Sequence, residues 1–199
     1  MPNYSYTDAI ERESPKSLFS NASYVWYNES KDKIVLFNNV AFARRTALLA
    51  ELALLEAERR AALAGRPAFL NLIGAGLGAW RVSPHQNDVF VVAAMHAARR
   101  LLAAGALCHV SDINFAYIST KKHVAELFKA SSGQRSNELK KIFLKNSSHP
   151  RGGINVQCEN REPLAALEGE HEGKLLVVTY PWDGNTLPGN EFWYFSDIL

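Results

Sequence analysis

A short apolar run that ends in three closely spaced glycines constrains the fold of this chain more than any other feature. Phe69–Ile73 is typical of a buried strand, and Gly74, Gly76 and Gly78 follow it at alternate positions. Glycine tolerates positive φ and lets another backbone or a ligand come within contact distance. A glycine turn after a strand leaves outward-facing backbone N–H groups, which suit a phosphate or diphosphate. A tight turn that needs glycine only for steric reasons explains these glycines equally well.

Apolar runs and amphipathic segments alternate along the chain, which predicts an α/β fold with helices on both faces of the sheet, in three α/β/α layers. We expect residues 1–32 to form a polar N-terminal extension and residues 33–199 to form one domain. The expected strands are 33–38, 69–73, 107–113, 154–158 and 174–180, and the expected helices are 41–64, 86–104, 121–130 and 137–144.

The first long helix, 41–64, has apolar residues at helical spacing, followed by Gly65 and Pro67 as stop signals. A helix of this kind packs on the sheet more often than it binds a partner. The residues expected to face the sheet are Leu48, Leu49, Leu52, Leu55 and Ala62.

Composition excludes several classes of protein. Hydrophobic residues make up 47% of the 199 residues, so a sizeable core is available, and the net charge of +2 does not by itself indicate nucleic acid or an anionic membrane. Cys108 and Cys158 lie far apart, and no Cys/His cluster has the spacing of a zinc site. The first residues lack the basic start and the apolar core of a signal peptide, so we expect none, and no apolar run is long enough to span a membrane. These features predict a soluble, cytoplasmic protein that holds no metal.

One interpretation of the glycines is a dinucleotide fingerprint, because Gly74-x-Gly76-x-x-Ala79 satisfies its spacing. The fingerprint requires a helix to begin within the glycines. Pro84 lies where that helix would already be in its second turn, and an interior proline costs about 3 kcal/mol. A nucleotide-dependent oxidoreductase is therefore a weak alternative.

Pro84 instead suits the start of the second long helix, with Ser83 as its N-cap. His85 and Gln86 then lie just after the glycine loop. The N–H groups of the first helical turn would add an anion-attracting end to the same pocket. Taken alone, His85 is more simply an exposed loop residue.

A second loop, which follows the predicted strand 174–180, is rich in polar side chains. Carboxylates and amides there suit ribose hydroxyls or a base edge, and a carboxylate can also orient or deprotonate a water. Trp182 flanks the loop and is able to stack on an adenine. Ordinary turn hydrogen bonds are the alternative explanation. The polar residues are Asp183, Asn185, Asn190 and Glu191, and they are interleaved with Gly184, Pro188 and Gly189.

Together, these two loops resemble a divergent macrodomain family. The resemblance is carried by the motifs at 74–80, at Gln86 and Phe90, and at 182–193. Members of this branch occur in amoebae and intracellular bacteria, including Legionella-type secreted effectors. Macrodomains are three-layer α/β/α folds that bind ADP-ribose at strand ends, and several release it from modified proteins. The resemblance also leads us to expect the domain to continue beyond Leu199.

The resemblance implies a role for each matching residue. The segment Gly74–Gly78, including Ala75 and Leu77, would hold the diphosphate. Asp183 and Asn185 would contact the distal ribose, and Asp183 or Glu191 would position the attacking water. The remaining expected ligand-binding residues are Trp80, Gln86, Trp182, Gly184, Gly189 and Asn190.

The resulting hypothesis is a hydrolase that releases ADP-ribose from a modified protein side chain. Its partners would be the ADP-ribosylated protein and ADP-ribose, with no cofactor, nucleic acid or membrane span. A non-catalytic reader of ADP-ribosylated proteins and a pure interaction protein that uses helix 41–64 are alternatives. We expect a cytoplasmic location, or secretion into a host cytosol if the protein is a bacterial effector.

Overall fold

The computed structural model describes residues 24–30, 33–78, 81, 83–120 and 141–179. Its helices and strands follow the order β1 (Tyr24–Ser30), β2 (Lys33–Asn38), α3 (Asn39–Ala64), β3 (Ala68–Ile73), α4 (His85–Ala103), β4 (Val110–Ala116), β5 (Lys141–Lys145), β6 (Gly153–Gln157), η1 (Gly169–His171) and β7 (Leu175–Val178).

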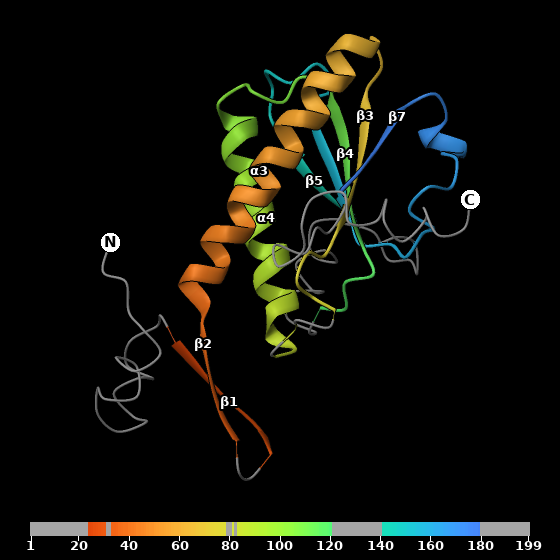
Figure 1. Cartoon of the computed structure of the whole chain (residues 1–199). Coiled ribbons are helices and arrows are strands. Elements are labelled where there is room, and N and C mark those ends of the chain that lie inside the picture. The colour runs from red at the N-terminus through yellow and green to blue at the C-terminus, as the bar shows by residue number, and fades with distance from the viewer. Residues whose placement is uncertain (1–23, 31–32, 79–80, 82, 121–140, 180–199) are drawn as a thin grey trace, which may run out of the picture.

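A five-stranded sheet with the order β5-β6-β4-β3-β7 forms the centre of the fold (Figure 1). The neighbours β6, β4, β3 and β7 are parallel, whereas β5 is antiparallel to β6. The four parallel strands therefore end at one edge of the sheet, here called the carboxyl edge. Ligands of parallel α/β sheets bind in the loops at such an edge.

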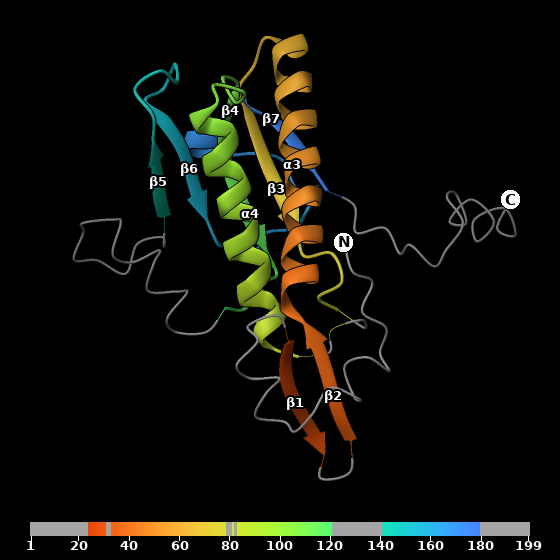
Figure 2. The ribbon, with the colours of Figure 1, turned by 90° about the vertical axis from the view of Figure 1, so that its left-hand side faces the viewer.

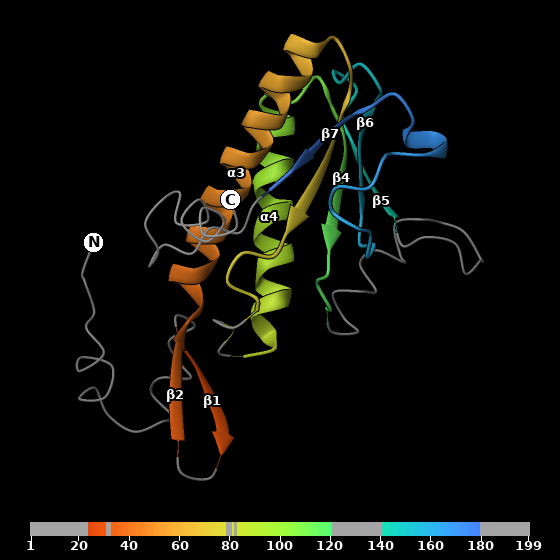
Figure 3. The same ribbon diagram turned by 45° about the vertical axis from the view of Figure 1, so that its right-hand side comes forward.

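Both long helices cover the same face of the sheet. Figure 2 shows α3 and α4 lying side by side across it, and Figure 3 shows η1 beyond the opposite face. The predicted α/β fold is confirmed, and the arrangement is consistent with three α/β/α layers. In the described residues, the layer opposite α3 and α4 consists of η1 and the segments around it.

The central strands bury apolar side chains towards the helices, and towards η1 they bury mostly polar side chains together with Phe69, whose ring contacts His171. Leu70 and Leu72 of β3 and Phe115 of β4 belong to the core cluster that contains residues of α3 and α4. Asn71 of β3 and Asn114 of β4 alternate with them and are also fully buried. Because successive side chains of a strand point to opposite faces, these amides lie on the η1 side.

The face of α3 that packs inward differs from the predicted one. Its buried residues are spaced three or four apart, as one helical face requires, and are mostly alanine, which lets α3 and α4 approach closely. The four leucines expected to face the sheet are instead 39–58% exposed within the described structure. The buried residues are Thr46, Ala50, Leu54, Ala57 and Ala61.

Other element boundaries also required correction. The strand expected at 107–113 spans 110–116, so Asp112 lies inside it rather than near its end. Residues 141–144, expected to be helical, belong to strand β5, because this segment pairs antiparallel with β6. The second long helix begins at His85, one residue before the predicted start.

The segment before α3 forms a hairpin in which β1 pairs antiparallel with β2. The expected boundary between residues 32 and 33 falls between these two strands, and the division into an extension and a domain stays a prediction. The predicted helix 121–130 lies outside the described residues. Within the described chain, no helix is long and apolar enough to cross a membrane.

Candidate functional site at the carboxyl edge of the sheet

The glycine loop leaves β3 at the carboxyl edge and presents open backbone to its surroundings. Gly76 and Gly78 are exposed, and a Cβ added to either would meet no atom within 4 Å. Gly76 has a φ of 73°, a left-handed conformation that favours glycine. The side chains of Ala75 and Leu77 pack against the core and anchor the loop. The loop therefore has room for a ligand at Gly76 and Gly78, while the other two residues hold it in place.

The start of α4 lies beside this loop and is closely hydrogen-bonded. The Ser83 N–H donates to Gln86 Oε1 at 2.8 Å, and Gln86 is 3% exposed. His85 is not the exposed loop residue that we expected. Its Nδ1 lies 2.6 Å from Ser83 Oγ and its Nε2 lies 2.9 Å from Asn39 Oδ1. The Gln86 side chain thus accepts a hydrogen bond from the Ser83 backbone. Contact of Gln86 with a ligand stays a prediction.

A row of three buried amides crosses the sheet just before the carboxyl edge. Asn71 of β3 is the register partner of Asn114 of β4, which in turn is the partner of Gln157 of β6. All three side chains are at most 1% exposed. Among the described residues, Asn71 Nδ2 and Gln157 Oε1 find no hydrogen-bond partner. Within the described structure, the central amide of the row, Asn114, is thus hydrogen-bonded, whereas each of the two outer amides has one buried polar atom without a partner.

Asn114 joins three strand ends through its side chain. Its Nδ2 donates to Asn71 Oδ1 at 2.8 Å and to the carbonyl oxygen of Glu159 at 3.0 Å, and its Oδ1 accepts from the Glu159 N–H at 2.9 Å. This amide thus fixes the chain that leaves β6. Sequence reasoning missed the row, and the available signal was one amide inside each of the strands β3 and β4 and two amides in β6.

Thr179 connects the second predicted loop to this edge. Its N–H donates to the Asn71 carbonyl oxygen at 3.1 Å, and its Oγ1 accepts from the Ile73 N–H at 2.8 Å. Thr179 therefore lies beside the end of β3, from which the glycine loop leaves. The predicted site residues that lie outside the described residues are Trp80, Trp182, Asp183, Gly184, Asn185, Gly189, Asn190 and Glu191.

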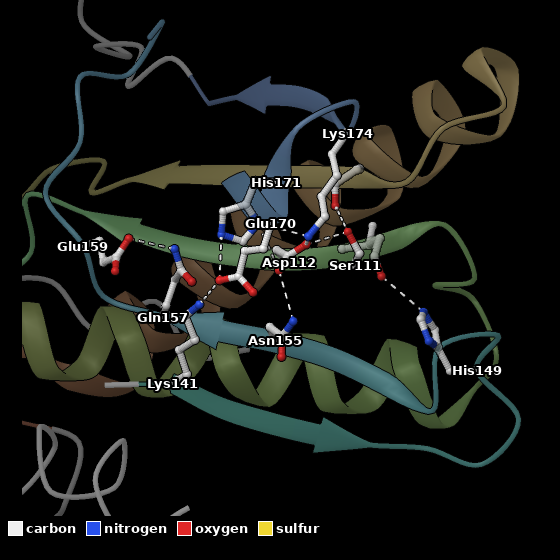
Figure 4. Close-up of polar contacts among 12 residues, drawn as sticks. Ser111, Asp112, Lys141, His149, Asn155, Gln157, Glu159, Glu170, His171 and Lys174 are labelled. Atoms are coloured by element: carbon white, nitrogen blue, oxygen red, sulfur yellow. Dashed lines mark hydrogen bonds and ion pairs between the residues drawn. The ribbon is translucent and has the colours of Figure 1, made fainter. Parts of the chain in front are cut away.

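A second polar cluster lies on the η1 face, where sequence reasoning predicted no site (Figure 4). Asp112 is fully buried, and its Oδ2 accepts from Lys174 Nζ and from Ser111 Oγ, both at 2.6 Å. Its Oδ1 accepts from Asn155 Nδ2 at 3.1 Å. Lys174 Nζ also donates to His171 Nδ1 at 3.0 Å, and burial lowers the pKa of His171. Because the groups around Asp112 are paired with one another, this cluster fastens the η1 segment to the sheet rather than forming a reaction centre.

A mostly apolar cavity of about 410 Å³ lies between α3 and β7. Leu49 and Ala53 line it from the helix, Val177 lines it from the strand, and Ala75 of the glycine loop borders it. Its walls are mostly apolar, and Glu56, Arg60 and Thr179 are its polar lining residues. In the described chain, no group of three or more His, Cys, Asp or Glu residues is arranged to hold a metal ion. Neither Cys108 nor Cys158 forms a disulfide bond within the described structure.

The fold and the edge together define an α/β protein whose candidate site lies at the ends of parallel strands. The family model described as ADP-ribosylhydrolase MavL-like matches residues 5–196. The chain belongs to this MavL-like ADP-ribosylhydrolase family. The predicted ADP-ribosylhydrolase family is thereby confirmed, and the macrodomain assignment stays a prediction.

Two relatives from Drosophila melanogaster are similar to most of the chain. It is 35% identical to ADP-ribosylarginine hydrolase CG2909 over 168 residues, which cover 84% of this chain and 30% of the relative. It is also 35% identical to ADP-ribosylarginine hydrolase CG3568 over 159 residues, which cover 79% of this chain and 28% of the relative. The chain thus spans less than a third of the length of these two relatives.

Proposed function

We propose that this protein binds ADP-ribose at the carboxyl edge and hydrolyses its bond to a protein side chain. The observation that carries the proposal is the exposed backbone of Gly76 and Gly78 after a buried parallel strand, in a chain of an ADP-ribosylhydrolase family. The diphosphate would accept hydrogen bonds from the loop N–H groups, as oriented backbone amides bind anions. A macrodomain-like, cytosolic protein fits this proposal.

The names of the two relatives favour arginine as the modified residue. In that reaction, water adds to the anomeric carbon of the distal ribose while the bond from this carbon to the guanidinium nitrogen breaks. One proton of the water goes to the leaving nitrogen, and the products are ADP-ribose and arginine. Asp183 or Glu191 would orient the water, accept this proton as the oxygen adds to the anomeric carbon, and pass it on to the leaving nitrogen.

Binding is tested by calorimetric titration of ADP-ribose into the wild type, Gly76→Ala and Gly105→Ala. Gly76 and Gly105 have φ angles of 73° and 69°, and at both positions a Cβ would meet no atom within 4 Å. Each variant should therefore lose about 1–2 kcal/mol of stability through the same backbone strain. Only Gly76→Ala should lose affinity, by about tenfold or more, if one charge-assisted hydrogen bond to the diphosphate is lost. Equal affinities of the two variants would contradict the diphosphate site.

Hydrolysis is tested separately, with ADP-ribosylated arginine peptide as the substrate and Asp183→Asn and Glu191→Gln as variants. Removal of a general base lowers turnover by about 10²- to 10⁴-fold. Binding without release of ADP-ribose by the wild type would identify a reader instead of a hydrolase. No binding at millimolar ADP-ribose would refute both functions.

A further inference from the structure

His85, the first residue of α4, forms hydrogen bonds through both nitrogens of its ring. Its Nε2 lies 2.9 Å from Oδ1 of Asn39, the first residue of α3, and its Nδ1 lies 2.6 Å from Ser83 Oγ. An amide oxygen can only accept, so Nε2 donates to Asn39, and Nδ1 of the neutral ring accepts from the Ser83 hydroxyl. One imidazole therefore joins the start of α3 to the chain that enters α4.

Ser83 lies between the glycine loop and α4 and is 1% exposed. Its N–H donates to Gln86 Oε1 at 2.8 Å, and its carbonyl oxygen accepts from the Gln86 N–H at 3.1 Å. Closer to the glycines, the Arg81 N–H donates to the Gly78 carbonyl oxygen at 3.0 Å. All these bonds are local and shape the turn, whereas the bond from His85 to α3 spans 46 residues. This bond therefore fixes the turn relative to a distant part of the chain.

The ring of His85 is also held by packing. Its centroid lies 5.2 Å from that of Phe37 in β2, with the two rings nearly perpendicular at 84°. Phe37 in turn lies 5.2 Å from Phe42 of α3. Edge-to-face contact of this kind favours one orientation of a ring. With its face held by Phe37 and both nitrogens bonded, the imidazole relates the position of the turn to that of α3.

The position of this turn matters because it lies at the edge where the glycine loop leaves β3. Figure 2 shows that α3 and α4 begin at the same end of the fold, towards which β3 points. Backbone N–H groups bind an anion best when they are already in place, because ordering them on binding reduces the affinity. We propose that His85 is a positioning residue, which holds the turn at Ser83 against α3 and so keeps the end of the glycine loop ready for the diphosphate. The inference rests on the proposed function, and His85 acts through Ser83 rather than by contact with ADP-ribose.

Calorimetric titration of ADP-ribose tests this role with variants of both bonded partners. His85→Ala removes both bonds of the imidazole and should raise Kd about tenfold or more, whereas Asn39→Leu removes one bond and should raise it about three- to tenfold. The double variant should bind no more weakly than His85→Ala, because the second substitution removes a bond that is already lost.

Two matched variants serve as controls. Asn39→Asp keeps the oxygen that accepts from His85 Nε2, so its affinity should equal that of the wild type. His96 is an exposed histidine of the same helix, and His96→Ala should also bind as the wild type does.

A purely structural role would give a different pattern. A substitution that only lowers the fraction of folded protein reduces the binding stoichiometry and kcat, and it leaves Kd and KM unchanged. A lost positioning contact should instead raise Kd and, with ADP-ribosylated arginine peptide, KM, while stoichiometry and kcat stay the same.

The outcomes distinguish this inference from the function beneath it. If the wild type binds no ADP-ribose, the proposed function fails. If the wild type binds and either His85→Ala or Asn39→Leu binds equally well, only the positioning role is overturned. A reduced stoichiometry at unchanged Kd would also overturn it, as would a double variant that binds more weakly than His85→Ala, because Asn39 would then act independently of His85.

Discussion

Replacing Asn114 tests whether the buried amide row holds the carboxyl edge together. Asn114→Leu keeps a side chain of similar size and removes its three hydrogen bonds, to Asn71 Oδ1 and to the carbonyl and N–H groups of Glu159. Those three groups would lose their partners in a region where Asn114 itself is fully buried. Leaving a buried polar group unpaired costs about 1–3 kcal/mol, so we expect a loss of about 3 kcal/mol or more. That is a large part of the 5–15 kcal/mol typical of a domain.

The variant Asn114→Asp tests the same amide row through the pH dependence of its stability. At neutral pH its carboxylate would face two acceptors, Asn71 Oδ1 and the Glu159 carbonyl oxygen, to which the wild-type amide donates. Burial and these acceptors would raise the pKa of the new carboxyl above its value in the unfolded chain. The neutral acid is therefore the form that the fold tolerates, and the defect should shrink as the pH falls.

Urea unfolding of both variants at pH 7.5 and pH 5.0 measures these effects. Asn155→Leu on neighbouring β6 is the control, because it removes a single side-chain bond, to Asp112. It should cost about 1.5 kcal/mol, roughly half the cost of Asn114→Leu. If Asn114→Leu cost no more than this control, or if the defect of Asn114→Asp did not change with pH, the role assigned to the amide row would be refuted.

Three further predictions concern the packing around the sheet. The Nδ1 of His149 accepts a hydrogen bond from the Gly153 N–H at 3.2 Å, and burial lowers the pKa of this histidine. The neutral form of His149 therefore stabilises the fold fully above about pH 6.5, and this stabilisation should decline at lower pH. The urea concentration at the unfolding midpoint should thus decrease when the pH is lowered from 7.5 to 5.5. An equally large decrease in the variant His149→Gln would show that His149 is not the cause. Gly153→Ala should lower stability by about 2 kcal/mol or more in thermal unfolding, because its Cβ would lie 2.2 Å from the Leu144 carbonyl oxygen; an unchanged melting temperature would contradict this. Lys174→Met should cost about 3–5 kcal/mol in urea, because it leaves the buried Asp112 charge without its ammonium partner, and adding Asp112→Asn should restore most of the loss.

Local sequence signals determined the elements that lead into the site. The apolar run 69–73 was predicted as a strand, and the structure confirms β3 at Ala68–Ile73. Pro84 indicated that the helix begins well after the glycines, and α4 begins at His85. These predictions succeeded because strand pattern, glycine turns and the restrictions of proline act within a few residues of chain.

Tertiary structure decided which faces of these elements are buried and which residues meet. Five of the six leucines of α3 are exposed, whereas Ala50, Ala57 and Ala61 turn inward, because small residues permit the close approach of α4. Residues 141–145 became a strand through pairing with β6.

The amide row also depends on the tertiary structure. Asn71, Asn114 and Gln157 lie far apart in the sequence and become neighbours only through the register of three parallel strands. Register and strand order depend on contacts between distant segments, which no local pattern records. The sequence by itself therefore determined that a glycine loop follows a buried strand, and only the tertiary structure decided which side chains surround that loop.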